Sequence, residues 1–84
     1  VPIFEEYNVN YAYLFGSYAK GKAKETSDID ILVSMPLNGL AFYELAERLR
    51  ESLKKKIDLL DESQLENNTL LVKEILQDGI KIYG

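Results

Sequence analysis

The sequence contains no cysteine and no histidine. Without thiols, disulfides, thiolate nucleophiles and the usual Cys/His zinc sites are excluded. Without an imidazole there is no histidine general base, and any metal ion must sit on oxygen ligands. The sequence also has no apolar run near the ~20 residues of a membrane span and no visible signal peptide, so we expect a cytoplasmic protein.

Basic charge is scarce as well. Ten Lys and Arg residues stand against fourteen Asp and Glu residues, which gives a net charge of -4 over 84 residues. Proteins that bind bare nucleic acid usually carry a basic surface, so direct nucleic-acid binding is not expected. At this length we expect one small domain with one thin hydrophobic core. The chain begins at Val1 rather than Met, so its N-terminus is not taken as complete.

Hydrophobic periodicity predicts a mixed α/β (α+β type) domain with about four strands and three or four helices. The expected strands are residues 9–15, 28–33, 57–61 and 80–83, and the expected helices are residues 2–7, residues 40–56 and a last helix that Asn68 or Thr69 caps and that ends at Gln77. Gly79 is placed to end the last helix. In the second strand Asp28, Asp30 and Leu32 fall on one side of the alternation.

The segment between the first two strands contains a near match to a nucleotide-binding P-loop. Gly16 is followed after four residues by Gly21 and Lys22. A P-loop has a hydroxyl residue for magnesium after its lysine, and here that residue is Ala23. The few residues before the next strand leave no room for the P-loop helix, because a parallel crossover takes at least ~10 to 12 residues. The P-loop interpretation therefore fails.

The same short connection predicts two neighbouring strands, which places Ser17 beside Asp28 and Asp30. Residues two apart on a strand point the same way with Cα atoms ~6.6 Å apart, so both carboxylates can hold one ion or bridge two. Their repulsion, about 3 kcal/mol at an effective dielectric near 20, favours a divalent cation, and Mg²⁺ suits oxygen ligands best. Asp58 is a third candidate, because it interrupts an otherwise apolar strand.

Plainer interpretations of each acid remain open at this point. Asp28 can mark the junction between loop and strand, and Asp30 can face solvent on an edge strand. Asp58 can be a hydrogen-bonded core acid or a residue at a strand end. Other uses of an Asp-x-Asp pair fit poorly: an EF-hand needs a glycine near Val33, a phosphatase-type pair follows an apolar strand rather than ETS, and a glycosidase needs a long cleft.

Taken together, Gly16-Ser17, ten further residues, Asp28-Ile29-Asp30 and the later Asp58 resemble the signature of the DNA polymerase beta-type nucleotidyltransferase superfamily. More narrowly, the segments YLFGSYAKGKAKETSDIDILV, KKIDLLD and ILQDGIKIYG resemble the minimal nucleotidyltransferases (MNT), many of which are antitoxins to HEPN-domain toxins. The resemblance implies that residues 1–84 form a single minimal nucleotidyltransferase domain with a palm-like fold. Lys20 departs from it, because many relatives carry arginine there, and the first helix is shorter than usual.

The resemblance also implies roles for these residues. The backbone at Gly16 and the hydroxyl of Ser17 would hold the triphosphate of ATP. Asp28 and Asp30 would hold two Mg²⁺ ions on the nucleotide. Asp58 would complete the metal site and help to deprotonate the acceptor hydroxyl. The reaction would be in-line attack on the α-phosphorus of ATP with release of pyrophosphate.

Residues around this motif have weaker assignments. Lys20, Lys22 and Lys24 either steer the triphosphate or form a solvated loop, and Tyr18 either stacks on a base or is an ordinary surface tyrosine.

The acceptor is inferred only from the family. Larger relatives append a helical domain that completes the acceptor site, and this sequence ends at Gly84 without one, so we expect another chain to supply it. In MNT/HEPN pairs the family role is transfer of AMP to a tyrosine of the toxin, which silences its RNase activity. Two alternatives stay open: a binding module that neutralises its partner by contact, and a nucleotidyltransferase that acts on a small molecule or an RNA end. Nucleotide preference and oligomeric state are also open.

Overall fold

The computed structural model describes residues 2–24, 26–36, 39–65 and 69–84. It confirms the predicted mixed α/β architecture. The strands are β1 (Tyr11–Phe15), β2 (Ile29–Ser34), β3 (Ile57–Asp61) and β4 (Ile80–Tyr83). The helices are α1 (Pro2–Glu6), α2 (Gly39–Leu53), the 3-10 helix η1 (Glu62–Leu65) and α3 (Thr69–Asp78).

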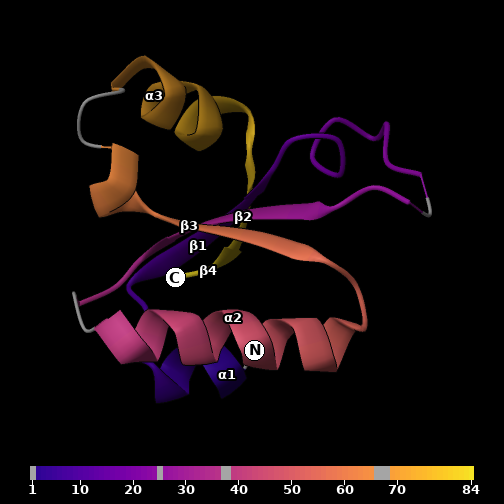
Figure 1. The fold of residues 1–84 in the computed structure, drawn as a ribbon. Helices are drawn as coiled ribbons and strands as arrows, with labels where there is room; N and C mark the ends of the chain where they lie inside the picture. Colours follow the sequence, from indigo (N-terminus) through magenta and orange to yellow (C-terminus); the bar gives the residue numbers. More distant parts are fainter. Residues whose placement is uncertain (1, 25, 37–38, 66–68) are drawn as a thin grey trace.

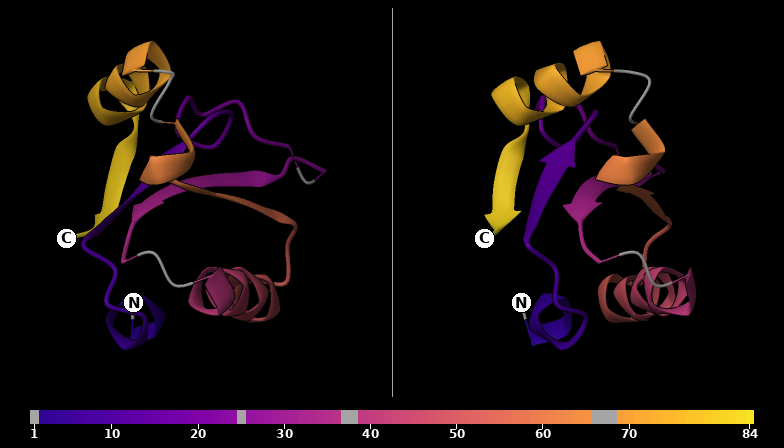
Figure 2. Two further views of the ribbon diagram at one scale, coloured as in Figure 1. Left: turned by 60° about the vertical axis from the view of Figure 1, so that its left-hand side comes forward. Right: turned by 90° about the vertical axis from the view of Figure 1, so that its left-hand side faces the viewer.

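The four strands form one mixed sheet in the order β3-β2-β1-β4. β2 and β3 are parallel and are joined by the crossover helix α2, whereas β1 pairs antiparallel with both β2 and β4. α1 and α2 cover one face of the sheet, and α3 lies on the other side (Figures 1 and 2). The turn after β1 and the connection between α2 and β3 lie toward the same end of the sheet, on the right in Figure 1.

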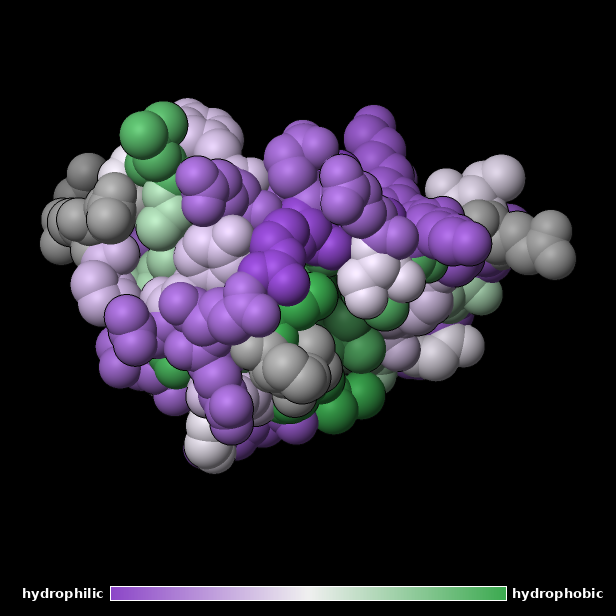
Figure 3. Space-filling view, turned by 90° about the horizontal axis from the view of Figure 1, so that it is seen from below, coloured by the Kyte–Doolittle hydropathy of each residue, from purple (hydrophilic) through white to green (hydrophobic). Residues whose placement is uncertain are grey.

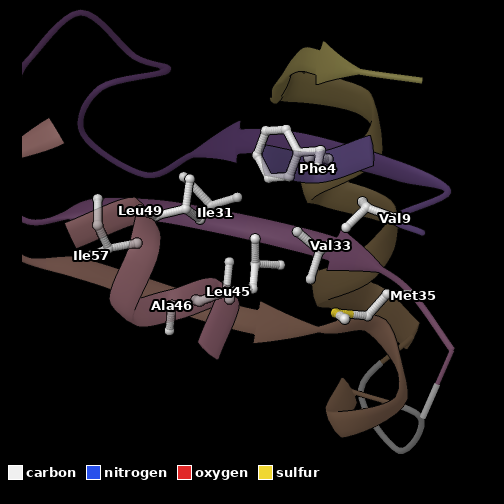
Figure 4. Packing of buried hydrophobic residues seen from close by; sticks show 11 residues of the cluster. Phe4, Val9, Ile31, Val33, Met35, Leu45, Ala46, Leu49 and Ile57 are labelled. Atoms are coloured by element: carbon white, nitrogen blue, oxygen red, sulfur yellow. The ribbon is translucent and has the colours of Figure 1, made fainter. Parts of the chain in front are cut away.

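The hydrophobic core lies between the sheet and the two helices α1 and α2. Ile31 of β2 and Ile57 of β3 point toward α2 and are at most 2% exposed. Leu45 and Leu49, one turn apart on α2, meet them from the other side (Figure 4). Phe4 of α1 closes the core at the N-terminal end of the chain. Because this face of β2 and β3 is apolar, the alternate residues of the two strands are directed to the opposite face.

Two element boundaries differ from the predicted ones because a residue adopts a left-handed backbone. Asn8 has φ 56°, and the amide of Val9 donates to Phe4 (3.1 Å), so a turn ends α1 and β1 begins only at Tyr11. Lys54 has φ 54°, so α2 ends at Leu53 and not at residue 56.

The end of β3 leads into a short 3-10 helix that the hydrophobic pattern did not predict. The carboxylate of Asp61 accepts a hydrogen bond from the amide of Ser63 (3.1 Å), and the side chain of Gln64 accepts one from the amide of Asp61 (3.0 Å). These side-chain contacts to the backbone fix η1 locally.

The last helix and strand follow the predicted pattern. α3 begins at Thr69; the alternative cap, Asn68, lies outside the described residues. Gly79 ends the helix as predicted, with its amide donating to the carbonyl of Ile75 (2.7 Å). A Cβ at Gly79 would also lie 3.0 Å from the carbonyl oxygen of Leu14, so the passage from α3 into β4 needs glycine.

The outer surface over α1 and α2 is largely hydrophilic, with apolar side chains gathered in a smaller area (Figure 3). Arg48 of α2 pairs with Glu6 at the end of α1, and its guanidinium lies 5.8 Å from the ring centroid of Tyr7. No helix within the described ranges combines the length and the apolar character that crossing a membrane requires.

Candidate active site

Asp30 and Asp58 are directly paired residues of the parallel strands β2 and β3. Their neighbours Ile31 and Ile57 are buried against α2, so both aspartates lie on the opposite face. Asp30 is half-buried and Asp58 is exposed. The interpretation of Asp30 as an edge-strand residue is therefore wrong, because β2 lies between β3 and β1, and Asp58 is not a core acid.

Asp28 lies one residue before β2, at the junction between loop and strand. Its Oδ2 atom lies 3.9 Å from Nζ of Lys56, in the connection between α2 and β3. The amide of Ile29 donates to the carbonyl of Lys56 (3.0 Å), which fixes the start of β2 beside this connection. Sequence reasoning missed Lys56, since nothing in the sequence indicates that the end of α2 returns to Asp28.

The three acids affect one another electrostatically. Partial burial raises the pKa of Asp30, and the charges of Asp58 and then Asp28 raise it further. When protonated, Asp30 also donates a hydrogen bond to Asp58, which acts in the same direction. The structure thus brings Asp28, Asp30 and Asp58 into one region. Across the described ranges, however, no three acidic side chains already stand in an arrangement that could hold a metal ion.

Gly16 lies directly against Asp30. Phe15 pairs with Asp30 across β1 and β2, and Gly16 then turns the chain with φ 73°. A Cβ on Gly16 would fall onto Oδ2 of Asp30 and would lie 3.1 Å from its Cγ. Glycine is therefore required both by the backbone conformation and by the close approach of the carboxylate. Ser17 follows at once and is half-buried, so the structure brings Gly16-Ser17 and Asp30 together as predicted.

The residues after Ser17 form a series of turns and no P-loop helix. The amide of Lys22 donates to the carbonyl of Ser17 (2.9 Å) and that of Lys20 to the carbonyl of Gly16 (3.2 Å). β1 and β2 then pair antiparallel, whereas a P-loop joins parallel strands, so the rejection of the P-loop is confirmed. Lys20, Lys22 and Lys24 are exposed.

Tyr18 is not a free surface tyrosine. Its hydroxyl accepts a hydrogen bond from Nζ of Lys55 (2.8 Å), and the same atom lies 5.5 Å from the ring centroid. No sequence pattern at Lys55 indicates this contact, so it was also missed.

Two of the hollows that described residues line bear differently on this site. One of about 140 Å³ lies between the turn at Gly16 and Lys20 and the helix α3, next to the candidate site. A larger one of about 480 Å³ is lined by Met35 and Asp61 at the other end of β2 and β3. The larger hollow lies several residues along the strands from Asp30 and Asp58. We therefore do not include it in the candidate active site, although it is the larger of the two.

Comparison with known sequences identifies the family. The sequence model described as "Polymerase beta, Nucleotidyltransferase" matches residues 1–84. A protein of Methanocaldococcus jannaschii, provisionally named a protein adenylyltransferase, is 40% identical over 80 residues, which are 93% of this chain and 81% of the relative. The protein adenylyltransferase MntA of Thermococcus cleftensis is 36% identical over 80 residues, with 93% of this chain and 79% of the relative covered.

A solved structure adds the fold. The structure of a tri-AMPylated Shewanella oneidensis HEPN toxin in complex with an MNT antitoxin matches with a TM-score of 0.70 and 29% identity, over 99% of this chain and 65% of that chain. The mixed four-stranded sheet agrees with these likenesses. The chain is therefore a minimal nucleotidyltransferase and belongs to the polymerase beta nucleotidyltransferase family.

Proposed function

We propose that this nucleotidyltransferase uses Mg²⁺ to transfer AMP from ATP to an acceptor hydroxyl, namely a tyrosine of a HEPN-domain partner in the cytoplasm, and that it thereby acts as an antitoxin. In this proposal residues 1–84 are one minimal catalytic domain. Asp28, Asp30 and Asp58 are its catalytic and metal-binding residues. Gly16 and Ser17 bind the triphosphate.

The observation that carries the proposal is the pairing of Asp30 with Asp58 beside Gly16. Two carboxylates side by side on the polar face of a sheet repel each other, and the pKa of Asp30 is raised first by its burial and then by this repulsion. Such an arrangement is costly for folding and is typical of a site that binds cations. Gly16 supports the assignment, because the lack of a side chain leaves its backbone and Ser17 open to a phosphate group next to those carboxylates.

The donor set fits Mg²⁺. All three side chains offer carboxylate oxygens, which are the ligands that Mg²⁺ prefers, and Asp58 is exposed enough to leave room for water and phosphate. Asp28 would have to turn from Lys56 toward Asp30, and its ion pair at 3.9 Å with a side chain that is 76% exposed is weak enough to allow this. Bound at these carboxylates, two Mg²⁺ ions would stabilise negative charge on the entering and leaving oxygens.

The chemistry then follows from the residues of this chain. The acceptor oxygen attacks the α-phosphorus of ATP, the new P–O bond forms, and the bond from the α-phosphorus to the bridging oxygen breaks to release pyrophosphate. Asp58 takes the proton of the acceptor hydroxyl, since the sequence has no histidine and Asp58 is the exposed member of the pair. Ser17 and the backbone at Gly16 hold the β- and γ-phosphates in line.

The acceptor is proposed from the relatives. Two similar proteins are named protein adenylyltransferases, one of them provisionally, and the matching solved complex contains an AMPylated HEPN toxin. Incubation of the protein with ATP labelled at the α-phosphate, Mg²⁺ and a candidate HEPN-domain partner protein tests the assignment. Labelled toxin that loses its label when the acceptor tyrosine is changed to phenylalanine supports the proposal, and an unlabelled wild-type toxin contradicts it.

A second candidate function is a binding module that neutralises its partner by contact. It is favoured by one observation: in the described residues Asp28 is paired with Lys56 and no ready cluster of three acids is present. The double variant Asp28→Asn, Asp30→Asn separates the two functions in cells that express the toxin. A contact antitoxin still protects the cells, whereas an enzyme with the proposed site does not.

A further inference from the structure

Three segments that carry the proposed site meet at one end of the sheet. They are the turn from Gly16 to Gly21, the junction at Asp28 before β2, and the connection of residues 54–56 that leads from α2 into β3 (Figure 1). The last of these has no proposed catalytic residue of its own. It nevertheless contacts the other two segments and runs directly into the strand that holds Asp58.

The turn after β1 is shaped mainly by bonds within itself. The amides of Lys20, Gly21 and Lys22 donate to the carbonyls of Gly16 (3.2 Å), Tyr18 (3.3 Å) and Ser17 (2.9 Å). These bonds set the path of the turn but do not attach it to the rest of the protein. An attachment is needed if Gly16 and Ser17 are to present a fixed surface to a triphosphate.

Lys55 provides such an attachment through Tyr18. Its Nζ atom donates to the Tyr18 hydroxyl at 2.8 Å and lies 5.5 Å from the centroid of the same ring. The contact is a charge-assisted hydrogen bond from an ammonium to a phenol oxygen, and both partners are at least half-buried. Tyr18 is separated from Gly16 by Ser17 alone, so its position restricts the backbone that would bind phosphate.

The neighbouring residue of the connection holds the second segment. The carbonyl of Lys56 accepts a hydrogen bond from the amide of Ile29 (3.0 Å), and the side-chain ammonium of Lys56 lies 3.9 Å from Oδ2 of Asp28. Adjacent lysines thus reach to opposite sides, one to the phosphate-binding turn and one to the start of β2. The connection aligns the turn and the acid-bearing strands relative to each other.

We propose that Lys55 is a positioning residue for the nucleotide, which acts through Tyr18 to hold the Gly16–Gly21 turn in the conformation that binds the triphosphate. The inference rests on the proposed function, since it deepens the assignment of Gly16 and Ser17. It predicts an effect on nucleotide binding with little effect on the chemical step, because Lys55 acts through Tyr18 on the turn that binds phosphate.

The test compares Lys55→Met, Tyr18→Phe, their combination and Lys55→Arg. Lys54→Met serves as the matched control, because it removes the same charge from the same connection and Lys54 has no side-chain contact to the turn among the residues described. Lys55→Met is expected to raise the KM for ATP about tenfold, equivalent to ~1.4 kcal/mol, and to change kcat less than about threefold. Tyr18→Phe, which removes the hydroxyl that Lys55 binds, has a similar effect, and the double variant is no worse than Lys55→Met. Lys55→Arg restores binding.

A second readout does not depend on activity. Backbone ¹⁵N relaxation of the nucleotide-free protein should show order parameters for the Gly16–Gly21 amides that fall from roughly 0.85 toward 0.6 in Lys55→Met and stay high in the control. Unchanged order parameters overturn the inference whether or not the protein is an enzyme, as does a loss of kcat at constant KM. If the turn loosens in Lys55→Met but the wild-type protein transfers no AMP, the positioning role of Lys55 is supported and the proposed function is contradicted.

Discussion

Asp30 and Asp58 face each other across the parallel pair β2–β3, on the side of the sheet that points away from α2. A sheet position of this kind is normally filled by residues that attract or pack against each other, and two like charges destabilise it. The pair therefore lowers the stability of the metal-free protein for the sake of its site, and its removal should affect stability and activity in opposite directions.

The first prediction concerns Asp30 itself. Asp30→Asn removes the repulsion and should raise the stability of the metal-free protein by about 1 kcal/mol, a small effect because Asp58 is exposed and water screens its charge. The same change should lower AMP transfer roughly hundred- to thousandfold. Urea unfolding and a transfer assay measure the two effects. Glu51→Gln, which removes an exposed acid of α2, should change neither. A less stable Asp30→Asn protein would contradict this account of the pair.

Gly16 and Gly21 have similar left-handed backbone conformations, so a comparison of their alanine variants separates the cost of backbone strain from the cost of a steric contact. Replacing either Gly16 (φ 73°) or Gly21 (φ 69°) with alanine should destabilise the protein by about 1 kcal/mol, because a residue with a Cβ disfavours the left-handed conformation. Only at Gly16 does the new Cβ meet the Asp30 carboxylate, whereas nothing lies within 4 Å at Gly21. We expect Gly16→Ala to be destabilised by about 1 to 3 kcal/mol more than Gly21→Ala, and to lose ATP binding as well. Equal losses in the two variants would show that Gly16 does not contact Asp30.

The pKa of Asp30 offers a direct probe of the three acids. Because it is raised in the folded protein, Asp30 binds its proton more tightly when folded, and its contribution to stability falls as pH rises from the ordinary aspartate range through this raised pKa. In the metal-free protein Asp58→Asn should lower the pKa of Asp30, although burial still holds it above its ordinary value. Carboxyl ¹³C shifts followed by NMR during titration measure the change. A pKa that does not move in Asp58→Asn would mean that the two carboxylates do not interact.

Tyr11 provides a prediction outside the site. Burial, and then a hydrogen bond and the charge of Glu62, raise its pKa to about 12, while a hydrogen bond with Ser34 partly offsets this. Folding stability linked to Tyr11 is therefore complete below the unfolded pKa of about 10 and is lost as pH rises from there toward 12. Tyr11→Phe should show a smaller decrease in stability over this range than the wild-type protein. Spectrophotometric titration should find that the phenol that ionises near pH 12 is missing from the variant.

Much of the fold was predictable because hydrophobic alternation and helical spacing are strong in this chain. The alternation of Asp28, Asp30 and Leu32 correctly placed the acids away from the core, and Gly79 correctly marked the end of α3. The start of β1 and the end of α2 were not predictable, because they depend on left-handed conformations at Asn8 and Lys54, which are not glycines. The short helix η1 was missed because it rests on side-chain contacts of Asp61 rather than on a periodic pattern.

The site was predictable only in part. The short connection after Ser17 correctly predicted neighbouring strands. The register that pairs Asp30 with Asp58 joins residues far apart in the sequence, and no local pattern encodes it. The contacts of Lys55 and Lys56 were missed for the same reason, since a run of lysines after a helix has an ordinary explanation at the helix end.

The central claim is that Asp28, Asp30 and Asp58 form one metal site beside Gly16. A crystal structure with Mn²⁺ and a non-hydrolysable ATP analogue tests it most directly, because Mn²⁺ takes the same oxygen ligands as Mg²⁺ and can be located by anomalous scattering. The account predicts anomalous peaks between these carboxylates, Asp28 released from Lys56, and the triphosphate against Gly16 and Ser17. A structure in which the analogue binds elsewhere, or in which Asp28 keeps its partner Lys56 and no metal lies between Asp30 and Asp58, would contradict it.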